Sequence, residues 1–111
     1  MVPFSDSRFA SVRTDMQDLS YAFASLRTAE EVQAFLRDLC TPQEMTMLTE
    51  RWTIAKLIQM GFPYRIINQK TGASSATISR VSQNLTKGSG ELLSACKRRQ
   101  EAITRQFATA E

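Results

Sequence analysis

Residues 63–80 are the part of this sequence whose residue types and spacing could recognise another molecule. Within them, Ser74 and Ser75 follow directly after a glycine-containing stretch that interrupts a helical pattern. A helix that begins at Ser74 would present hydroxyl groups together with backbone N–H groups that have no acceptor inside the helix. Helix starts of this kind bind phosphate well. The run therefore favours a phosphate-bearing partner.

The pattern predicts a short helix on each side of the glycine-containing stretch, and this arrangement is a helix-turn-helix motif. The first runs from 63 to about 70, and the turn is expected at 71–73, where Gly72 can adopt a positive φ. Ile67 and Ile78 would form the apolar contact that sets the crossing angle. Since the second helix of such a motif lies in the major groove, double-stranded DNA is the expected partner. The candidate DNA-binding residues are Arg65, Lys70, Ser74, Ser75, Ala76, Thr77, Ser79 and Arg80.

These candidates divide by the contact each could make. Short hydroxyl side chains and alanine can approach base edges or a thymine methyl group closely. Arg80 could bind either a guanine edge or a phosphate, whereas Arg65 and Lys70, on the preceding helix, are expected to bind the DNA backbone.

The charge distribution supports a polyanionic partner. The chain has 111 residues and a net charge of +3, but residues 1–50 carry a net −4 and residues 51–99 a net +8. A concentrated positive region attracts nucleic acid and speeds the encounter with it. The same distribution would also fit a protein-interaction module whose basic helices bind an acidic partner.

Enzymatic and metal-binding roles are not expected. Histidine is absent, and Cys40 and Cys96 have neither a CxxC spacing nor a visible base. We expect two free thiols, no metal and no cofactor. No apolar run is long enough for a membrane span, and residues 1–6 do not resemble a signal peptide, so a cytoplasmic protein is predicted.

The rest of the chain predicts an all-α protein of about six helices. Residues 1–11 are expected to form a flexible arm, 12–62 dimerisation helices, 63–87 the DNA-reading head, and 88–111 a C-terminal helix and tail. Apolar residues repeat every three or four positions in each helical segment, as in the expected buried stripe of Met16, Leu19, Phe23 and Leu26. Two capping boxes, at 28–31 and 41–44, predict helix starts, and Gly61 predicts a helix end.

Residues 16–92 resemble the Trp repressor superfamily, in particular its branch of proteins named YerC/YecD. The resemblance lies in three runs, of which the third is the most specific: Leu36-Arg37-Asp38-Leu39-Cys40-Thr41-Pro42, Leu48 with Arg51, and Thr71-Gly72-Ala73-Ser74-Ser75-Ala76-Thr77-Ile78-Ser79-Arg80-Val81-Ser82. The resemblance implies an all-helical homodimer with intertwined N-terminal helices. It also implies two reading heads set one DNA turn apart on a pseudo-palindrome.

The same resemblance implies an effector pocket, which in the repressor holds tryptophan between two arginines. The matching positions here are Thr41, Arg51, Thr77, Arg80, Val81 and Asn84. Val81 replaces a glycine that makes room for the indole ring, and Asn84 replaces a serine. Since overpacking of this kind costs about 1–3 kcal/mol, we expect no tryptophan dependence and no small-molecule effector. Arg51 and Arg80 would then serve a salt bridge or a phosphate. The predicted function is a transcriptional regulator that represses by occupying its site; a repressor that senses another small molecule is the alternative.

Lys97, Arg98 and Arg99 form a basic cluster beyond the region of resemblance. They could add a phosphate contact, or they could simply be solvated on a terminal helix.

Overall fold

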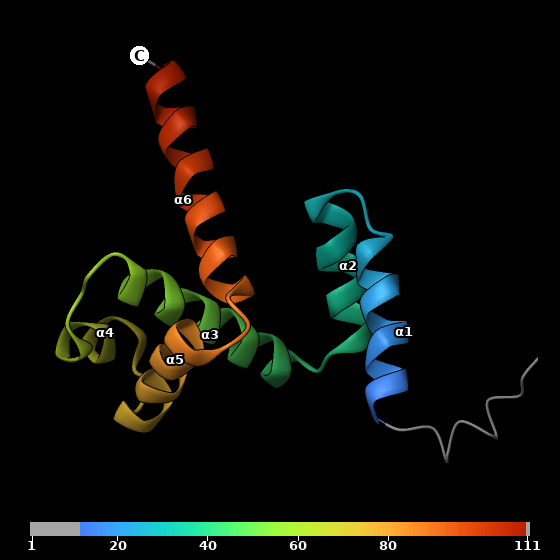
Figure 1. Ribbon diagram of the computed structural model, residues 1–111, viewed down its shortest axis with the longest axis horizontal. Coiled ribbons are helices and arrows are strands. Elements are labelled where there is room, and N and C mark those ends of the chain that lie inside the picture. The colour runs from blue at the N-terminus through green and yellow to red at the C-terminus, as the bar shows by residue number, and fades with distance from the viewer. Residues whose placement is uncertain (1–11, 111) are drawn as a thin grey trace, which may run out of the picture. The chain divides into compact units, whose positions relative to one another are not determined.

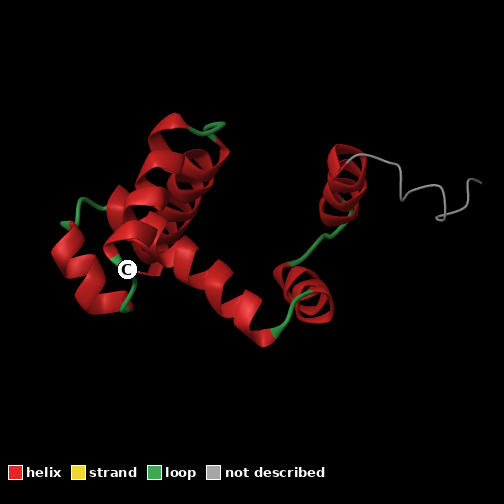
Figure 2. Cartoon of the chain, turned by 90° about the horizontal axis from the view of Figure 1, so that it is seen from below, coloured by secondary structure: helices red, strands yellow, loops and turns green. Residues whose placement is uncertain are grey.

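The computed structural model of this protein describes residues 12–110, which form six helices and no strand (Figures 1 and 2). This confirms the predicted all-α architecture. The expected N-terminal arm, residues 1–11, lies outside the described residues. The helices are α1 (Val12–Ala24), α2 (Ala29–Leu39), α3 (Pro42–Gln59), α4 (Tyr64–Thr71), α5 (Ser75–Lys87) and α6 (Glu91–Ala110).

The chain divides into two compact units, here called the N-terminal unit (Met1–Pro42) and the C-terminal unit (Gln43–Glu111). The sequence suggested a division after residue 62 instead, which grouped α3 with α1 and α2. In the structure α3 contributes Ile54 and Ala55 to the core of the C-terminal unit. The compact unit that contains the predicted helix-turn-helix therefore includes most of α3.

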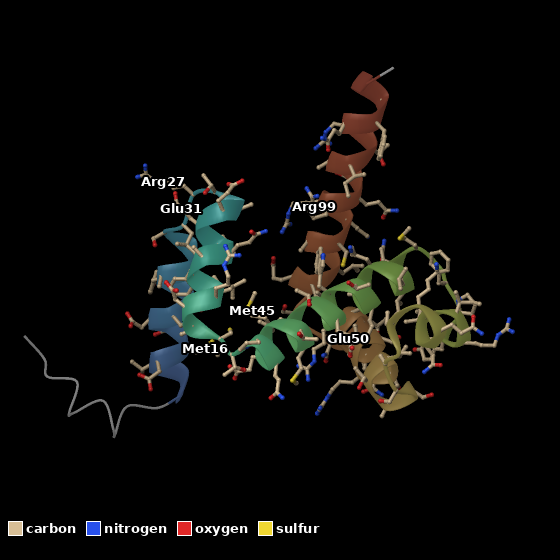
Figure 3. The ribbon with its side chains drawn as sticks, turned by 180° about the vertical axis from the view of Figure 1, so that it is seen from behind. Met16, Arg27, Glu31, Met45, Glu50 and Arg99 are labelled. Atoms are coloured by element: carbon tan, nitrogen blue, oxygen red, sulfur yellow. The ribbon has the colours of Figure 1, made fainter. Side chains whose placement is uncertain are left out.

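The N-terminal unit is a pair of helices joined by a short turn. The predicted Thr28 cap at the start of α2 is present, because Thr28 Oγ1 accepts from the Glu31 N–H at 3.1 Å. Glu31 also reaches back as expected, although its Oε1 accepts from the Arg27 N–H at 3.2 Å, one residue before the cap. Figure 3 labels Arg27 and Glu31 at this end of the helix pair. These bonds satisfy donors that the helix start would otherwise leave without acceptors.

The apolar stripe of α1 is only partly covered. The rings of Phe23 and Phe35 meet edge to face at 4.9 Å between centroids, which joins α1 to α2. Leu19 and Leu26 are half-buried, however, and Met16 is 56% exposed. The stripe is therefore not buried within the chain as expected, because each helix of a pair can cover only one face of the other. No described residue of this unit is fully buried.

The core of the described chain lies in the C-terminal unit. α5 packs against α4 and α6, and the second half of α3 completes the cluster. The buried residues are Ile54, Ala55, Ile67, Ala73, Ile78, Val81, Leu85 and Cys96. Burial of Ile78, Val81 and Leu85 on one face of α5 holds that helix against α4 and α6.

The end of α3 sets the direction in which the chain enters α4. Gly61 has φ +90°, its N–H donates to Ile58 O at 2.9 Å, and the Phe62 N–H donates to Leu57 O at 3.1 Å. This pair of bonds is the Schellman arrangement, which needs a left-handed residue. Gly61 therefore ends the helix, as the sequence predicted.

Within residues 12–110 no helix has the length and apolar character that a membrane crossing requires.

Candidate nucleic-acid interface

The turn between α4 and α5 is built around Gly72. Its backbone lies at φ 75° and ψ 2°, in the left-handed region, and its N–H donates to Asn68 O at 2.8 Å. Thr71 is still helical, so the turn begins one residue later than the sequence suggested. The left-handed geometry reverses the chain tightly enough for α5 to pack against α4.

Two polar side chains fix this turn, and the sequence analysis singled out neither of them for that role. Asn68 Nδ2 donates to Ala73 O at 2.6 Å. Thr71 Oγ1 donates to Ile67 O at 2.8 Å and accepts from the Ala73 N–H at 3.1 Å. Asn and Thr beside a turn glycine often bond the backbone in this way, and their position was the available signal.

The start of α5 is capped as predicted. Ser74 Oγ accepts from the Thr77 N–H at 3.2 Å, and the Ser74 and Thr77 hydroxyl oxygens lie 3.1 Å apart. The helix buries Ile78, Val81 and Leu85 on one face. Its polar residues consequently lie on the opposite face and at its exposed beginning.

The structure places the predicted DNA-binding residues on α4 and on the start of α5. Thr77 and Ser79 are half-buried. Lys70 Nζ lies 5.6 Å from the centre of the Phe62 ring, which gives it a cation–π contact. The others are exposed at the surface: Arg65, Lys70, Ser74, Ser75, Ala76 and Arg80.

A hollow of about 270 Å³ lies between α3 and α5, next to this surface. It brings together five of the six residues of the expected effector pocket, with Ala76 added: its lining is Arg51, Ala76, Thr77, Arg80, Val81 and Asn84. Thr41 is not in the lining and belongs to the N-terminal unit.

Val81 forms part of the floor of this hollow. Its side chain is 3% exposed and belongs to the core cluster with Ile54 and Ile78. The branched side chain thus occupies space beneath the hollow, while the polar groups of Thr77 and Asn84 line its wall.

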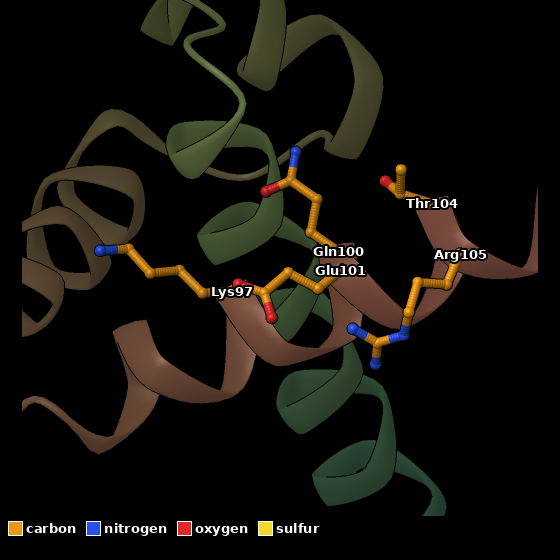
Figure 4. Close-up of a pocket in the computed structure, with 5 residues that line it drawn as sticks. All are labelled: Lys97, Gln100, Glu101, Thr104 and Arg105. Atoms are coloured by element: carbon orange, nitrogen blue, oxygen red, sulfur yellow. The ribbon is translucent and has the colours of Figure 1, made fainter. Parts of the chain in front are cut away.

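The basic cluster Lys97, Arg98 and Arg99 is exposed on α6. α6 leads away from α4 and α5 (Figure 1). A groove along this helix contains Lys97 and Arg105, and Figure 4 shows the Glu101 carboxylate between them. All the residues that line this groove come from α6, so it is a strip of helix surface and encloses nothing.

The two cysteines are free thiols. Burial raises the pKa of the Cys96 thiol, and the nearby Lys56 ammonium acts in the opposite direction. Among residues 12–110, no three His, Cys, Asp or Glu side chains come together as metal ligands.

A short helix, a left-handed glycine turn and a capped second helix with a polar start together define a helix-turn-helix protein. The comparisons with known proteins agree. The family model described as Trp repressor protein matches residues 14–100, and the chain belongs to this family. Membership indicates a helix-turn-helix DNA-binding regulator.

Individual relatives place the chain within the family. It is 37% identical over 90 residues to the uncharacterized protein YerC of Bacillus subtilis (strain 168), a match that covers 81% of this chain and 86% of YerC. The YerC-like branch expected from the sequence is therefore confirmed.

Two crystal structures confirm the fold. A candidate Trp repressor from Staphylococcus aureus aligns with a TM-score of 0.72 and 34% identity, over 90% of this chain and 96% of that one. A TrpR-like protein from Eubacterium eligens aligns with a TM-score of 0.73 and 32% identity, over 85% of this chain and 95% of that one.

Proposed function

We propose that this protein is a sequence-specific transcriptional regulator that reads double-stranded DNA with α5. The observation that carries the proposal is the exposed, polar start of α5, held beside α4 by the Gly72 turn, on two helices that carry Arg65, Lys70 and Arg80 and no Asp or Glu. Such a helix start fits the major groove, and the positive region around it favours the DNA backbone.

The contacts divide into two kinds. The N–H groups of Ser75 and Ala76 have no acceptor inside α5, because the helix begins at Ser75, and they suit a phosphate. Arg65 and Lys70 on α4 add backbone contacts that set the register. Side chains at the start of α5, in particular Ala76 and Ser79, are short enough to let base edges approach.

The regulator acts as a homodimer on a pseudo-palindromic site. Support comes from the N-terminal unit, where Met16 is 56%, Tyr21 76% and Leu39 53% exposed. Apolar side chains exposed at this density mark a surface that another chain covers. A dimer would present two reading heads about one DNA turn apart, and it would repress by occupying a promoter in the cytoplasm, where the chromosome lies.

Tryptophan is not required for this activity. Val81 lines the hollow between α3 and α5 and puts a branched side chain where the repressor has a glycine that makes room for the indole ring, and Asn84 stands where the repressor has a serine. Calorimetric titration of the protein with tryptophan should give no heat of binding. Saturable binding at micromolar concentration would refute tryptophan independence and leave the DNA-binding proposal standing.

Selection from a pool of randomised DNA duplexes tests the proposal. The protein should enrich a pseudo-palindrome whose half-site centres lie about 10–10.5 base pairs apart. Ser75→Glu should lower the affinity for the selected duplex by about tenfold or more, because its carboxylate would face the DNA backbone. The fold should survive, since a carboxylate in the first turn stabilises a helix by about 0.3–1 kcal/mol.

Gln33→Glu on α2 is the matched control, because it adds the same charge at an exposed position outside the helix-turn-helix. It should leave the affinity unchanged. No enrichment of any sequence, or equal effects of Ser75→Glu and Gln33→Glu, would refute DNA reading by α5.

A further inference from the structure

The hollow between α3 and α5 carries a concentration of positive charge that the fold itself does not neutralise. Arg51 and Arg80 enter it from two different helices, and no acidic residue belongs to its lining. Within residues 12–110 neither guanidinium has a carboxylate partner. Two unpaired guanidinium groups at one hollow repel each other, and an anion between them would remove that repulsion.

The other groups of the lining also suit an anion with several oxygens. The Thr77 hydroxyl and the Asn84 side-chain amide can both donate hydrogen bonds, and the floor is the apolar Val81. Guanidinium groups bind phosphate with two parallel hydrogen bonds, which makes arginine better suited than lysine to such a site. The volume of about 270 Å³ accommodates a phosphate group with water around it.

The α6 groove differs from this hollow in its charge and in the number of helices that form it. Its Lys97 and Arg105 have the Glu101 carboxylate between them, and a single helix forms its whole surface (Figure 4). Positive charge there is partly compensated, and nothing lies opposite the helix to close on a ligand.

We propose that the hollow formed by Arg51, Thr77, Arg80 and Asn84 is a phosphate-binding site. The phosphate comes either from the DNA backbone or from a free phosphate compound that competes with DNA. Because Ala76 and Thr77 belong both to this lining and to the exposed start of α5, a DNA strand beside α5 would bring a backbone phosphate close to it. The DNA arm of the inference rests on the proposed function, and the free-phosphate arm does not.

The first experiment titrates the full chain with inorganic phosphate and follows backbone amide signals by NMR, with sodium chloride at equal ionic strength as control. The amide signals of Thr77, Arg80 and Asn84 should shift saturably with phosphate and not with chloride. The shifts should disappear in Arg51→Ala and remain in Arg27→Ala, which removes an equal charge from the N-terminal unit. Arg51→Lys should retain the fold and part of the affinity, which separates lost binding from lost folding.

The second experiment measures DNA affinity against salt for Arg51→Ala, Arg80→Ala and the Arg27→Ala control. If the DNA backbone supplies the phosphate, the first two variants should weaken binding to selected and unrelated duplexes by the same factor. Each should also make the negative slope of log affinity against log salt shallower by about 0.9.

The outcomes separate the two sources and the two proposals. If the amide signals shift saturably with phosphate and the salt dependence of DNA affinity is unchanged in the variants, the site binds a free phosphate compound. If the salt dependence becomes shallower in the variants, the site binds the DNA backbone. Unchanged slopes together with no phosphate shifts, or a loss confined to the selected sequence on Arg80→Ala, would overturn the site. If the wild-type chain bound no DNA, the proposed function would fail, and the NMR titration alone would still decide the phosphate site.

Discussion

At the scale of single residues, the geometry of the reading head depends on a few positions around Gly72. A Cβ added there would meet no atom within 4 Å, so a substitution is opposed only by the backbone conformation, φ +75°. Gly72→Ala should therefore lower the free energy of unfolding by about 1–2 kcal/mol. Gly72→Asn should cost less, because asparagine tolerates the left-handed region. Urea unfolding measures both, and an alanine variant as stable as wild type would contradict this reading of the turn.

The cap of α5 allows stability to be separated from DNA binding. Ser74→Ala removes the acceptor for the Thr77 N–H and should cost about 1 kcal/mol of unfolding free energy. Ser74→Asp keeps an acceptor and should preserve stability, while its negative charge weakens DNA binding. Thermal unfolding and DNA titration of the two variants check this, and a Ser74→Asp variant that binds DNA like wild type would place the start of α5 away from the DNA.

Cys96 gives a prediction that depends on pH. Burial raises the pKa of its thiol, so the folded state favours the protonated form. The stabilisation is complete below the unfolded-state pKa, about 8.5, and is lost as pH rises through the folded-state pKa. Alkylation followed by mass spectrometry should therefore find Cys96 protected at pH 8 in the folded protein and reactive in urea. Equal rates in both conditions would show that the thiol is not buried.

Some residue roles were accessible from sequence and others were not. The Ser74 cap and the Gly72 turn follow from local chemistry, which depends on neighbours within a few positions. Arg51 and Arg80 come together from different helices, and only the family resemblance brought them into one group. The bond from Asn68 to Ala73 O depends on the packing angle of α4 and α5, which periodicity does not specify.

At the scale of elements, the buried stripe of α5 was predictable because Ile78, Val81 and Leu85 follow helical spacing and find α4 and α6 opposite them. The stripes of α1 and of the first half of α3 have the same spacing, yet Met16 and Leu48 remain exposed. Periodicity predicts which face is apolar. It does not say whether the chain itself supplies the covering surface.

The stability of the reading head should depend strongly on Ile78. This side chain is fully buried between the helices of the C-terminal unit, so Ile78→Ala should cost about 2–5 kcal/mol and Ile78→Val about 0.5–1.5 kcal/mol. Chemical denaturation measures both variants. A cost below that range for Ile78→Ala would mean that α5 is not held in the packed position described here.

At the scale of the whole molecule, the uncovered N-terminal unit leads to a prediction about assembly. Met16 and Leu39 are more than half exposed, so charged residues there would be harmless in a monomer. If a second chain covers them, Met16→Glu with Leu39→Glu should convert the dimer to a monomer. Sedimentation equilibrium should give twice the mass of one chain for wild type and for Gln33→Glu, and a single chain for the double variant. A wild-type monomer at all concentrations would contradict the dimer.

The central claim is that α5 and the basic residues around it bind duplex DNA. The most direct test is the affinity of the wild-type protein for duplex DNA, measured by fluorescence polarisation over a series of salt concentrations. We predict binding at low salt whose log affinity falls linearly with log salt, with a slope of about −0.9 for each phosphate contacted. No binding at low ionic strength, or an affinity that does not change with salt, would contradict the claim.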